Sequence, residues 1–223
     1  MQRRSALLTL VCLIATGCGA ERAGHDNKSS TDVALAAAVR VEADGCRTKA
    51  SIGGGSFVDE EEVLTVAHVV AGAKQVHVLL ADGTRVVATV TAIDRKKDLA
   101  VLHVEREITP LPRGTMRPGA TGSFVVYRDE QAVALMFEAM SYVDINAPSI
   151  DDEGSSLRRG YQITAEVEKG DSGSVLVSNG VATGVVFARS TTTGQKAWVV
   201  DITEADELLE SAKETTVDVG ECS

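Results

Sequence analysis

The most informative stretch of this sequence is KGDSGS, residues 169–174, which lies just before the strand-like run Val175 to Ser178. Ser172 stands between an aspartate and a glycine, and the glycines on either side let the backbone turn, since they have no Cβ to restrict it. Such a turn can point successive N–H groups at one spot. A serine hydroxyl becomes a useful nucleophile only with a base to take its proton and donors to hold the oxyanion.

Two further segments supply the groups that an active serine needs. The candidate base is His68, in the segment LTVAHVV at residues 64–70. The candidate orienting carboxylate is Asp98, which opens the segment DLAVL at residues 98–102. Asp98 follows His68 by 30 residues and precedes Ser172 by 74. The order His, Asp, Ser at these spacings suits two small barrels with a site between them.

These three segments together resemble the trypsin-like (chymotrypsin-fold) serine proteases, most closely the bacterial HtrA/DegP-like branch and the MarP-type envelope proteases of mycobacteria. The resemblance covers about residues 46–222 and implies two six-stranded antiparallel β-barrels with a short C-terminal helix. It implies that Ser172 attacks a peptide carbonyl, that His68 takes its proton, and that Asp98 orients the imidazole. The oxyanion hole would consist of the backbone N–H groups of Gly170 and Ser172.

Each motif taken alone has a structural explanation. A histidine at an apolar strand end is often a core residue, as we expect for His77 and His103. Asp98 could simply begin a strand, and the glycines around Ser172 could form an ordinary tight loop. The functional interpretation depends on the three motifs occurring together, in order and at a plausible spacing.

Composition limits the class of protein. The chain has 223 residues, of which 44% are hydrophobic and 4% aromatic, so its core must consist mainly of Val, Ala, Leu and Ile. The formal net charge is −10 and no long basic face is evident, so we expect no nucleic-acid partner. No Cys-x-x-Cys or paired histidine spacing occurs, and we expect neither a metal nor an organic cofactor.

The first residues have the pattern of an export signal. Arg3 and Arg4 precede an apolar stretch from Ala6 to Ala15, which is too short to span a membrane. The following ATGC, residues 15–18, resembles a lipoprotein box except that alanine replaces its usual leucine. We predict a signal peptide at 1–17, lipidation of Cys18, and a flexible tether at 18–32. Plain secretion with cleavage near Ala20 is the alternative.

The cysteines fit an exported protein. Cys12 and Cys18 lie in or next to the signal, which leaves Cys46 and Cys222. A remaining pair in an exported protein usually forms a disulfide, and the MarP-type proteases have a similar pattern. A disulfide that closes the loop from residue 46 to residue 222 would stabilise the fold by about 5 kcal/mol on the chain-entropy model. Two free thiols are the alternative.

The rest of the chain divides into short strands and turns typical of a barrel. We predict a protease domain at 33–223, with a first barrel at 33–110, a linker at 111–122 and a second barrel at 123–204. Residues 33–41 are ambiguous between a helix and a strand, and 147–160 read as an exposed loop. Residues 205–223 are predicted to form a helix and a tail. We expect a monomer.

Substrate specificity is predicted from the resemblance alone. Glu166, six residues before the serine, would lie at the base of the specificity pocket and favour a basic side chain, with Glu168 as its rival. Phe187, Ala188 and Arg189 would line the opposite wall, where a substrate strand could pair with their backbone. Asp171 is either a turn residue or the partner of a new N-terminal amine. No Ile-Val-Gly-Gly start supplies such an amine.

We therefore expect an exported serine endopeptidase that acts on proteins or peptides, held at a membrane surface by a lipid or secreted. The alternative is an inactive module on the same scaffold that binds envelope proteins, with its pocket filled by Arg189 or the 147–160 loop. An esterase is disfavoured, because no G-x-S-x-G elbow is present.

Overall fold

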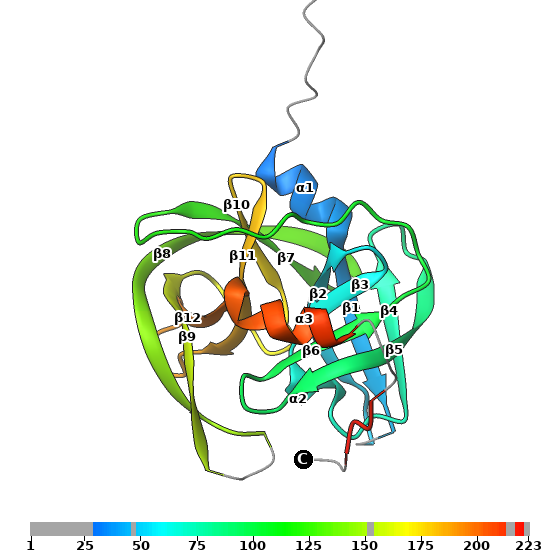
Figure 1. Ribbon diagram of the computed structural model, residues 1–223. Helices are drawn as coiled ribbons and strands as arrows, with labels where there is room; N and C mark the ends of the chain where they lie inside the picture. The colour runs from blue at the N-terminus through cyan, green and yellow to red at the C-terminus, as the bar shows by residue number, and fades with distance from the viewer. Residues whose placement is uncertain (1–28, 46–47, 151–153, 213–216, 221–223) are drawn as a thin grey trace, which may run out of the picture.

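The computed structural model describes residues 29–45, 48–150, 154–212 and 217–220 (Figure 1). The predicted signal segment and Cys18, Cys46 and Cys222 lie outside these residues. The described chain is mostly strand, with three short α-helices and one 3-10 helix. The elements are α1 Ser30–Ala37, β1 Ala38–Asp44, β2 Ser51–Asp59, β3 Glu62–Thr65, α2 Ala67–Val70, β4 Gln75–Leu80, β5 Arg85–Asp94, β6 Leu99–His103, β7 Thr121–Arg128, β8 Gln131–Pro148, β9 Ser155–Thr164, β10 Val175–Ser178, β11 Val181–Arg189, β12 Lys196–Asp201, η1 Ile202–Ala205 and α3 Asp206–Ala212.

Two rings of six antiparallel strands make up the molecule, as the sequence predicts. The first ring has the order β1-β2-β3-β6-β5-β4, and its last strand pairs with its first. The second has the order β10-β11-β12-β9-β8-β7 and closes through a short pairing of Leu176 and Val177 with Phe124 and Ser123. The segment between His103 and Thr121 connects the rings and includes most of the predicted linker at 111–122.

Each terminal helix packs on the barrel to which it does not belong in sequence (Figure 1). Helix α1 precedes the first barrel, yet it contacts β7 and β10 of the second. Helix α3 follows the second barrel, yet it contacts β5 and β6 of the first. The two helices therefore tie the barrels together from opposite ends of the chain. Within the described ranges no helix is long and apolar enough to cross a membrane.

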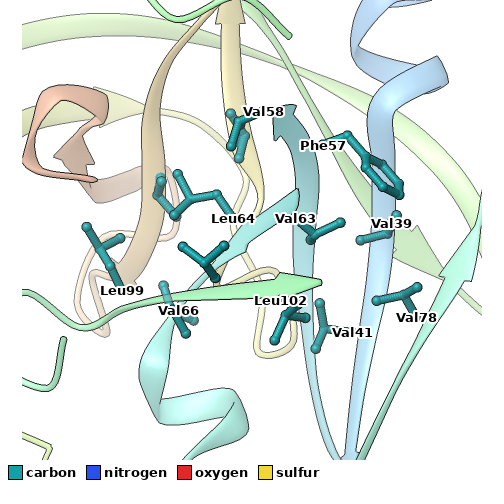
Figure 2. Packing of buried hydrophobic residues seen from close by; sticks show 14 of the residues in the cluster. Val39, Val41, Phe57, Val58, Val63, Leu64, Val66, Val78, Leu99 and Leu102 are labelled. Carbon is teal, nitrogen blue, oxygen red and sulfur yellow. The ribbon is translucent and has the colours of Figure 1, made fainter. Parts of the chain in front are cut away.

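The core of the first barrel is built from small aliphatic side chains, as the low aromatic content predicts. Figure 2 shows valines and leucines of β1, β3, β4 and β6 converging with Phe57. Val63, Leu64 and Leu102 are fully buried there. β-Branched side chains suit a pleated, enclosed surface, which favours these short strands. This packed barrel gives the segments carrying His68 and Asp98 a rigid base.

The ambiguous segment at 33–41 contains both predicted structures. Helix α1 begins at Ser30, inside the predicted tether, because Ser29 and Asp32 form a reciprocal capping box. The chain passes directly into strand β1 at Ala38. At the other end, the predicted terminal helix is preceded by the 3-10 turn η1, whose start is capped by Asp201.

The predicted exposed loop at 147–160 is the main error in the sequence-based fold. Strands β8 and β9 pair from Glu138–Thr164 out to Pro148–Ser155, with one register shift between Ala139 and Ser141, so most of this segment is a long hairpin. Its polar composition suggests solvent exposure, but side chains alternate between the two faces of a strand. Arg158 consequently points inward and is only 2% exposed. The hairpin reaches the first barrel next to Asp98.

Candidate active site

His68 lies on the short helix α2, which follows β3 directly, and not at a strand end as the sequence suggests. Its ring Nδ1 is 2.8 Å from Oδ2 of Asp98, and its backbone N–H donates to Oδ1 of the same carboxylate at 2.9 Å. The acceptor beside Nδ1 places the ring proton there and leaves Nε2 with a free lone pair. The ring is therefore oriented as a proton acceptor.

Asp98 is 3% exposed and has left-handed backbone geometry, with φ of 57°. Such a conformation is uncommon outside glycine and is tolerated best by Asp and Asn. The turn before it is fixed by Asp94, whose carboxylate accepts the backbone N–H groups of Lys96 and Lys97 at 2.9 and 2.8 Å. The strained position is thus set by local hydrogen bonds.

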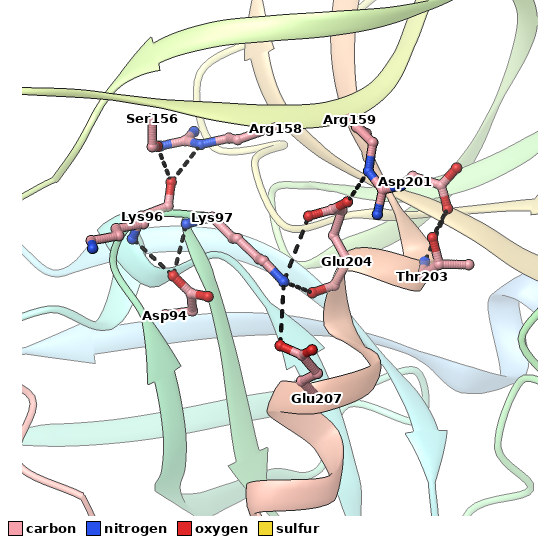
Figure 3. A network of polar contacts seen from close by, with 10 residues as sticks. All are labelled: Asp94, Lys96, Lys97, Ser156, Arg158, Arg159, Asp201, Thr203, Glu204 and Glu207. Carbon is pink, nitrogen blue, oxygen red and sulfur yellow. Dashed lines mark hydrogen bonds and ion pairs between the residues drawn. The ribbon is translucent and has the colours of Figure 1, made fainter.

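The second barrel also holds this turn, as Figure 3 shows. The carbonyl of Lys96 accepts hydrogen bonds from Ser156 and from Nε of Arg158, the latter at 2.9 Å. The ammonium of Lys97 lies 3.1 Å from the carbonyl oxygen of Glu204 and 3.6 Å from its carboxylate. Both residues before Asp98 are therefore anchored across the junction between the barrels.

Arg158 is a site residue that sequence reasoning missed. Its Nη1 lies 3.7 Å from Oδ2 of Asp98, the oxygen that faces His68. Its Nη2 donates to the carbonyl of Pro148 at 3.0 Å, and its guanidinium lies over the ring of Phe187 at 5.1 Å. Burial lowers the pKa of Arg158, and the nearby carboxylate of Asp98 opposes that shift. A buried cation thus stands behind the carboxylate of the candidate triad.

Ser172 lies in the loop between β9 and β10, held against the first barrel. Its carbonyl accepts the N–H of Gly54 at 2.7 Å, and the N–H of Gly173 donates to Val186 at 2.7 Å. Gly173 has φ of 93°, and a Cβ there would lie 2.1 Å from the carbonyl oxygen of Gly54. Only glycine fits this close approach of backbone to backbone.

One cavity joins the candidate groups. Its volume is about 730 Å³, and its walls include His68, Gly170 and Ser172. Within the described part of the chain, neither the Gly170 nor the Ser172 N–H donates to a protein acceptor. The Ser172 hydroxyl makes no hydrogen bond with the His68 ring in that same part. Catalytic hydrogen bonds are often long without substrate and shorten in the complex.

Asp171 has a partner that neither of its predicted roles includes. Its carboxylate, in a residue 1% exposed, accepts two hydrogen bonds from Arg128, at 2.5 and 2.9 Å. Its Oδ2 also accepts the backbone N–H of Glu168 at 2.7 Å. The hydrogen bonds to Asp171 raise the pKa of Arg128 above its usual value. Arg128, and not an N-terminal amine, thus neutralises the buried carboxylate of Asp171 beside Ser172.

Of the predicted specificity residues, Glu166 follows strand β9 and residues 187–189 end β11, and both strands pair with β12. Glu166 is exposed and lines a separate hollow with Thr164 and Gln195, which shares no lining residue with the cavity at His68 and Ser172. The role of Glu166 at the base of the specificity pocket stays a prediction. Its rival, Glu168, is exposed and lies 3.6 Å from Nε of Arg128.

The residues predicted to form the opposite wall lie at the end of one strand. Phe187, Ala188 and Arg189 end strand β11, and the last two pair with Trp198 and Ala197 of β12. Strand β10 pairs with β11 only as far as Val185. In the described chain, the other edge of 187–189 has no strand partner.

Comparisons with known proteins agree with this geometry. A family model described as a trypsin-like peptidase domain matches residues 53–188, which include His68, Asp98 and Ser172. The serine proteases MT3772 and Rv3671c, from two strains of Mycobacterium tuberculosis, are each 30% identical over 177 residues. That match covers 76% of this chain and 44% of each relative, so the chain spans less than half of their length.

Solved structures match more of the chain. The active form of the Rv3671c protease from M. tuberculosis has a TM-score of 0.81 at 27% identity, covering 88% of this chain and 89% of that one. The HtrA-type protease AlgW with a decapeptide has a TM-score of 0.70 at 19% identity, covering 84% and 67%. The latter likeness concerns the fold alone.

Proposed function

This chain belongs to the trypsin-like serine protease family, and from that premise we propose that it is an endopeptidase with His68, Asp98 and Ser172 as its catalytic triad. One observation carries the proposal. The His68 ring is oriented through a buried carboxylate and lines the same cavity as Ser172 and Gly170. Together, these residues can supply the base, the nucleophile and the oxyanion donors that the reaction requires.

The proposed reaction has two stages. His68 Nε2 accepts the Ser172 proton as Oγ bonds to the carbonyl carbon of the substrate, and the carbonyl oxygen becomes an oxyanion. The N–H groups of Gly170 and Ser172 stabilise that charge, and each such donor contributes about 3 kcal/mol to the transition state. The C–N bond then breaks, and His68 gives its proton to the departing amine. A water molecule hydrolyses the resulting acyl-enzyme by the same steps.

The test compares Ser172→Ala with Ser211→Ala, which removes an exposed hydroxyl in helix α3. We expect Ser172→Ala to abolish turnover of a casein-type substrate, since the attacking atom is gone, and Ser211→Ala to keep it. Both variants should melt near the wild-type temperature. Turnover that survives in a folded Ser172→Ala protein would contradict the assignment of the nucleophile.

Binding without cleavage is the second candidate function. It is favoured by one observation, which is that the Ser172 hydroxyl makes no hydrogen bond with the His68 ring within the described chain. The two functions differ in whether Ser172 is nucleophilic. In either case the free edge of β11 at residues 187–189 supports binding of an extended protein segment there.

We further propose export, with a signal at 1–17 and lipidation of Cys18, and secretion in soluble form as the alternative. The support is the arrangement of charged, apolar and small residues at the start of the sequence. Mass spectrometry of the mature protein tests both. An N-terminal Cys18 bearing lipid supports anchoring, an unmodified N-terminus near Ala20 supports secretion, and an intact Met1 contradicts export.

A disulfide between Cys46 and Cys222 belongs to the same proposal. Its support is that the segments next to both cysteines meet at one turn of the first barrel. The Lys74 N–H donates to the carbonyl of Asp44 at 2.8 Å, and the Gly72 N–H donates to that of Val219 at 3.0 Å. Peptide mapping without reduction should recover the two cysteines in one linked peptide. Free thiols in the exported protein would contradict the pairing.

A further inference from the structure

The cavity beside Ser172 has a charge opposite to that of the whole chain. The formal net charge of the protein is −10. Arg40 of β1, Lys49 of the loop before β2, and Lys169 of the serine loop all line this cavity, and Asp129 is the one carboxylate among the described lining residues. Three cations against one anion make the cavity wall locally positive. Low-dielectric walls concentrate such a field and attract groups of opposite charge.

The two lysines are the free charges of this wall. Arg40 lies 3.3 Å from the carboxylate of Glu42, which offsets part of its charge. In the ranges that the structure describes, neither Lys49 nor Lys169 has a carboxylate within the 4.0 Å of an ion pair. Lys169 also directly precedes Gly170, a proposed oxyanion donor. Both lysines thus line the same cavity as His68 and Ser172.

The position of the cavity decides which half of a substrate it would meet. His68 has to protonate the departing amine, so the leaving half of the substrate passes on the His68 side of Ser172. The cavity continues on that side, along Val69, Ser51 and Ile52 of the first barrel. Its lining does not include residues 187–189 of β11, where the other half of the substrate would pair.

From these observations we infer that the cavity selects peptide substrates with an aspartate or glutamate shortly after the scissile bond. The inference rests on the proposed endopeptidase function and names its substrate class. A carboxylate in this position would enter the cavity whose wall carries Lys49 and Lys169. The predicted preference at Glu166 concerns the other half of the substrate and a different hollow.

The experiment begins from a bond that the protein cleaves in a casein-type substrate. Three amidated peptides are made around that bond, identical except for Glu, Gln or Lys at the second residue after it. Amidation removes the terminal carboxylate, so any preference comes from the side chain. For partly exposed pairs, we expect kcat/KM for the Glu peptide to exceed that for the Lys peptide about ten-fold. The ratio should shrink between about 50 mM and about 300 mM NaCl, because salt screens exposed charges.

Charge reversal on the wall provides the second arm. Lys49→Glu and Lys169→Glu should each lower the Glu-to-Lys ratio by about five-fold or more. Arg117→Glu is the matched control, since Arg117 is exposed in the connection between the barrels and does not line the cavity. It changes the net charge equally and should leave the ratio unchanged.

The outcomes distinguish a failure of this inference from a failure of the proposed endopeptidase function. Equal cleavage of the three peptides by the wild type, or an equal effect of Arg117→Glu and Lys49→Glu on the ratio, would overturn the inference and leave the endopeptidase intact. Failure to cleave any peptide or protein, in a folded preparation, would contradict the proposed function itself.

Discussion

Two buried aspartates beside the candidate site are each held by an arginine of the second barrel, and the arginines are used differently. Arg128 gives two hydrogen bonds to the carboxylate of Asp171, and its own side chain is 34% exposed. Arg158 is 2% exposed and directs its hydrogen bonds to the carbonyls of Lys96 and Pro148, with Asp98 at 3.7 Å. Arg128 therefore neutralises the Asp171 carboxylate, whereas Arg158 holds the backbone that surrounds the Asp98 carboxylate.

The difference follows from what each aspartate must do. Asp171 has no further partner side chain in the described chain beyond Arg128, so direct pairing keeps its buried charge compensated. Asp98 already accepts two hydrogen bonds from His68. A direct bidentate arginine would compete for those oxygens. Arg158 instead stabilises the turn and contributes its charge at a distance.

Replacing Arg158 should have the largest effect on stability. Arg158→Met removes the donor for two carbonyls and the cation next to Asp98. Loss of one member of a buried charged network typically costs about 3–5 kcal/mol, so we expect the free energy of unfolding in urea to fall by about 3 kcal/mol. In the folded fraction, kcat should fall with little change in KM, since Arg158 does not line the cavity.

Arg159→Met is the control for this prediction. Arg159 is the next residue on the same strand, but its side chain is exposed and pairs with Glu204. Its replacement should leave the urea midpoint much closer to that of the wild type. Equal stability of the two variants would contradict a stabilising role for the buried network around Asp98.

Replacing Arg128 should have the next largest effect, and mainly on catalysis. Arg128→Gln leaves the Asp171 carboxylate buried beside Ser172 without a cation, and water reaches it in part because Arg128 is partly exposed. We expect a loss of stability of about 2 kcal/mol. We also expect a fall in kcat/KM of more than about ten-fold, because a shifted loop misaligns the oxyanion donors.

The double variant Arg128→Gln/Asp171→Asn distinguishes charge from packing. It removes both charges, so stability should recover well beyond that of Arg128→Gln alone. Effects of the two substitutions that simply add would indicate that the pair is not energetically coupled.

Tyr127, which precedes Arg128, should have the smallest effect. Its hydroxyl donates to the carbonyl of Ala38 at 3.2 Å and so links β7 to β1. Tyr127→Phe should cost about 1 kcal/mol. Burial raises the pKa of Tyr127 from 10.0 to about 12. The unfolded chain therefore loses this proton first as pH rises, and stability from the neutral phenol is full below pH 10.0 and decreases toward pH 12.

Melting temperatures measured between about pH 9 and about pH 11 check this sign. The wild type should lose stability across the interval more steeply than Tyr127→Phe, which has no hydroxyl to titrate. Parallel curves for the two proteins would show that Tyr127 does not contribute to the alkaline loss.

The triad segments and the two barrels could be predicted because their signals are local. His68, Asp98 and Ser172 each lie in a short motif, and the strands around them have runs of β-branched residues. The helix at Ser30 also had a local signal, the capping pair Ser29 and Asp32. These features depend on residues near one another in the chain.

The residues that sequence reasoning missed depend on distant partners. Arg128 and Asp171 are 43 residues apart, and nothing in either local segment predicts their pairing. Arg158 lies in a polar segment whose burial follows from the register of β8 and β9, which composition does not reveal. For Glu166, the spacing from Ser172 predicts a place in the specificity pocket, and the structure shows it lining a hollow with Thr164 and Gln195, so its role stays a prediction.

The most direct test of the central claim is covalent labelling by a fluorophosphonate, which reacts with a serine only when a base has activated it. We predict one label per wild-type molecule, located on Ser172 by peptide mass spectrometry, absent in Ser172→Ala and much slower to form in His68→Ala. A folded wild-type protein that takes up no label, or one labelled on another residue, would contradict the convergence of His68, Asp98 and Ser172 in a working catalytic site.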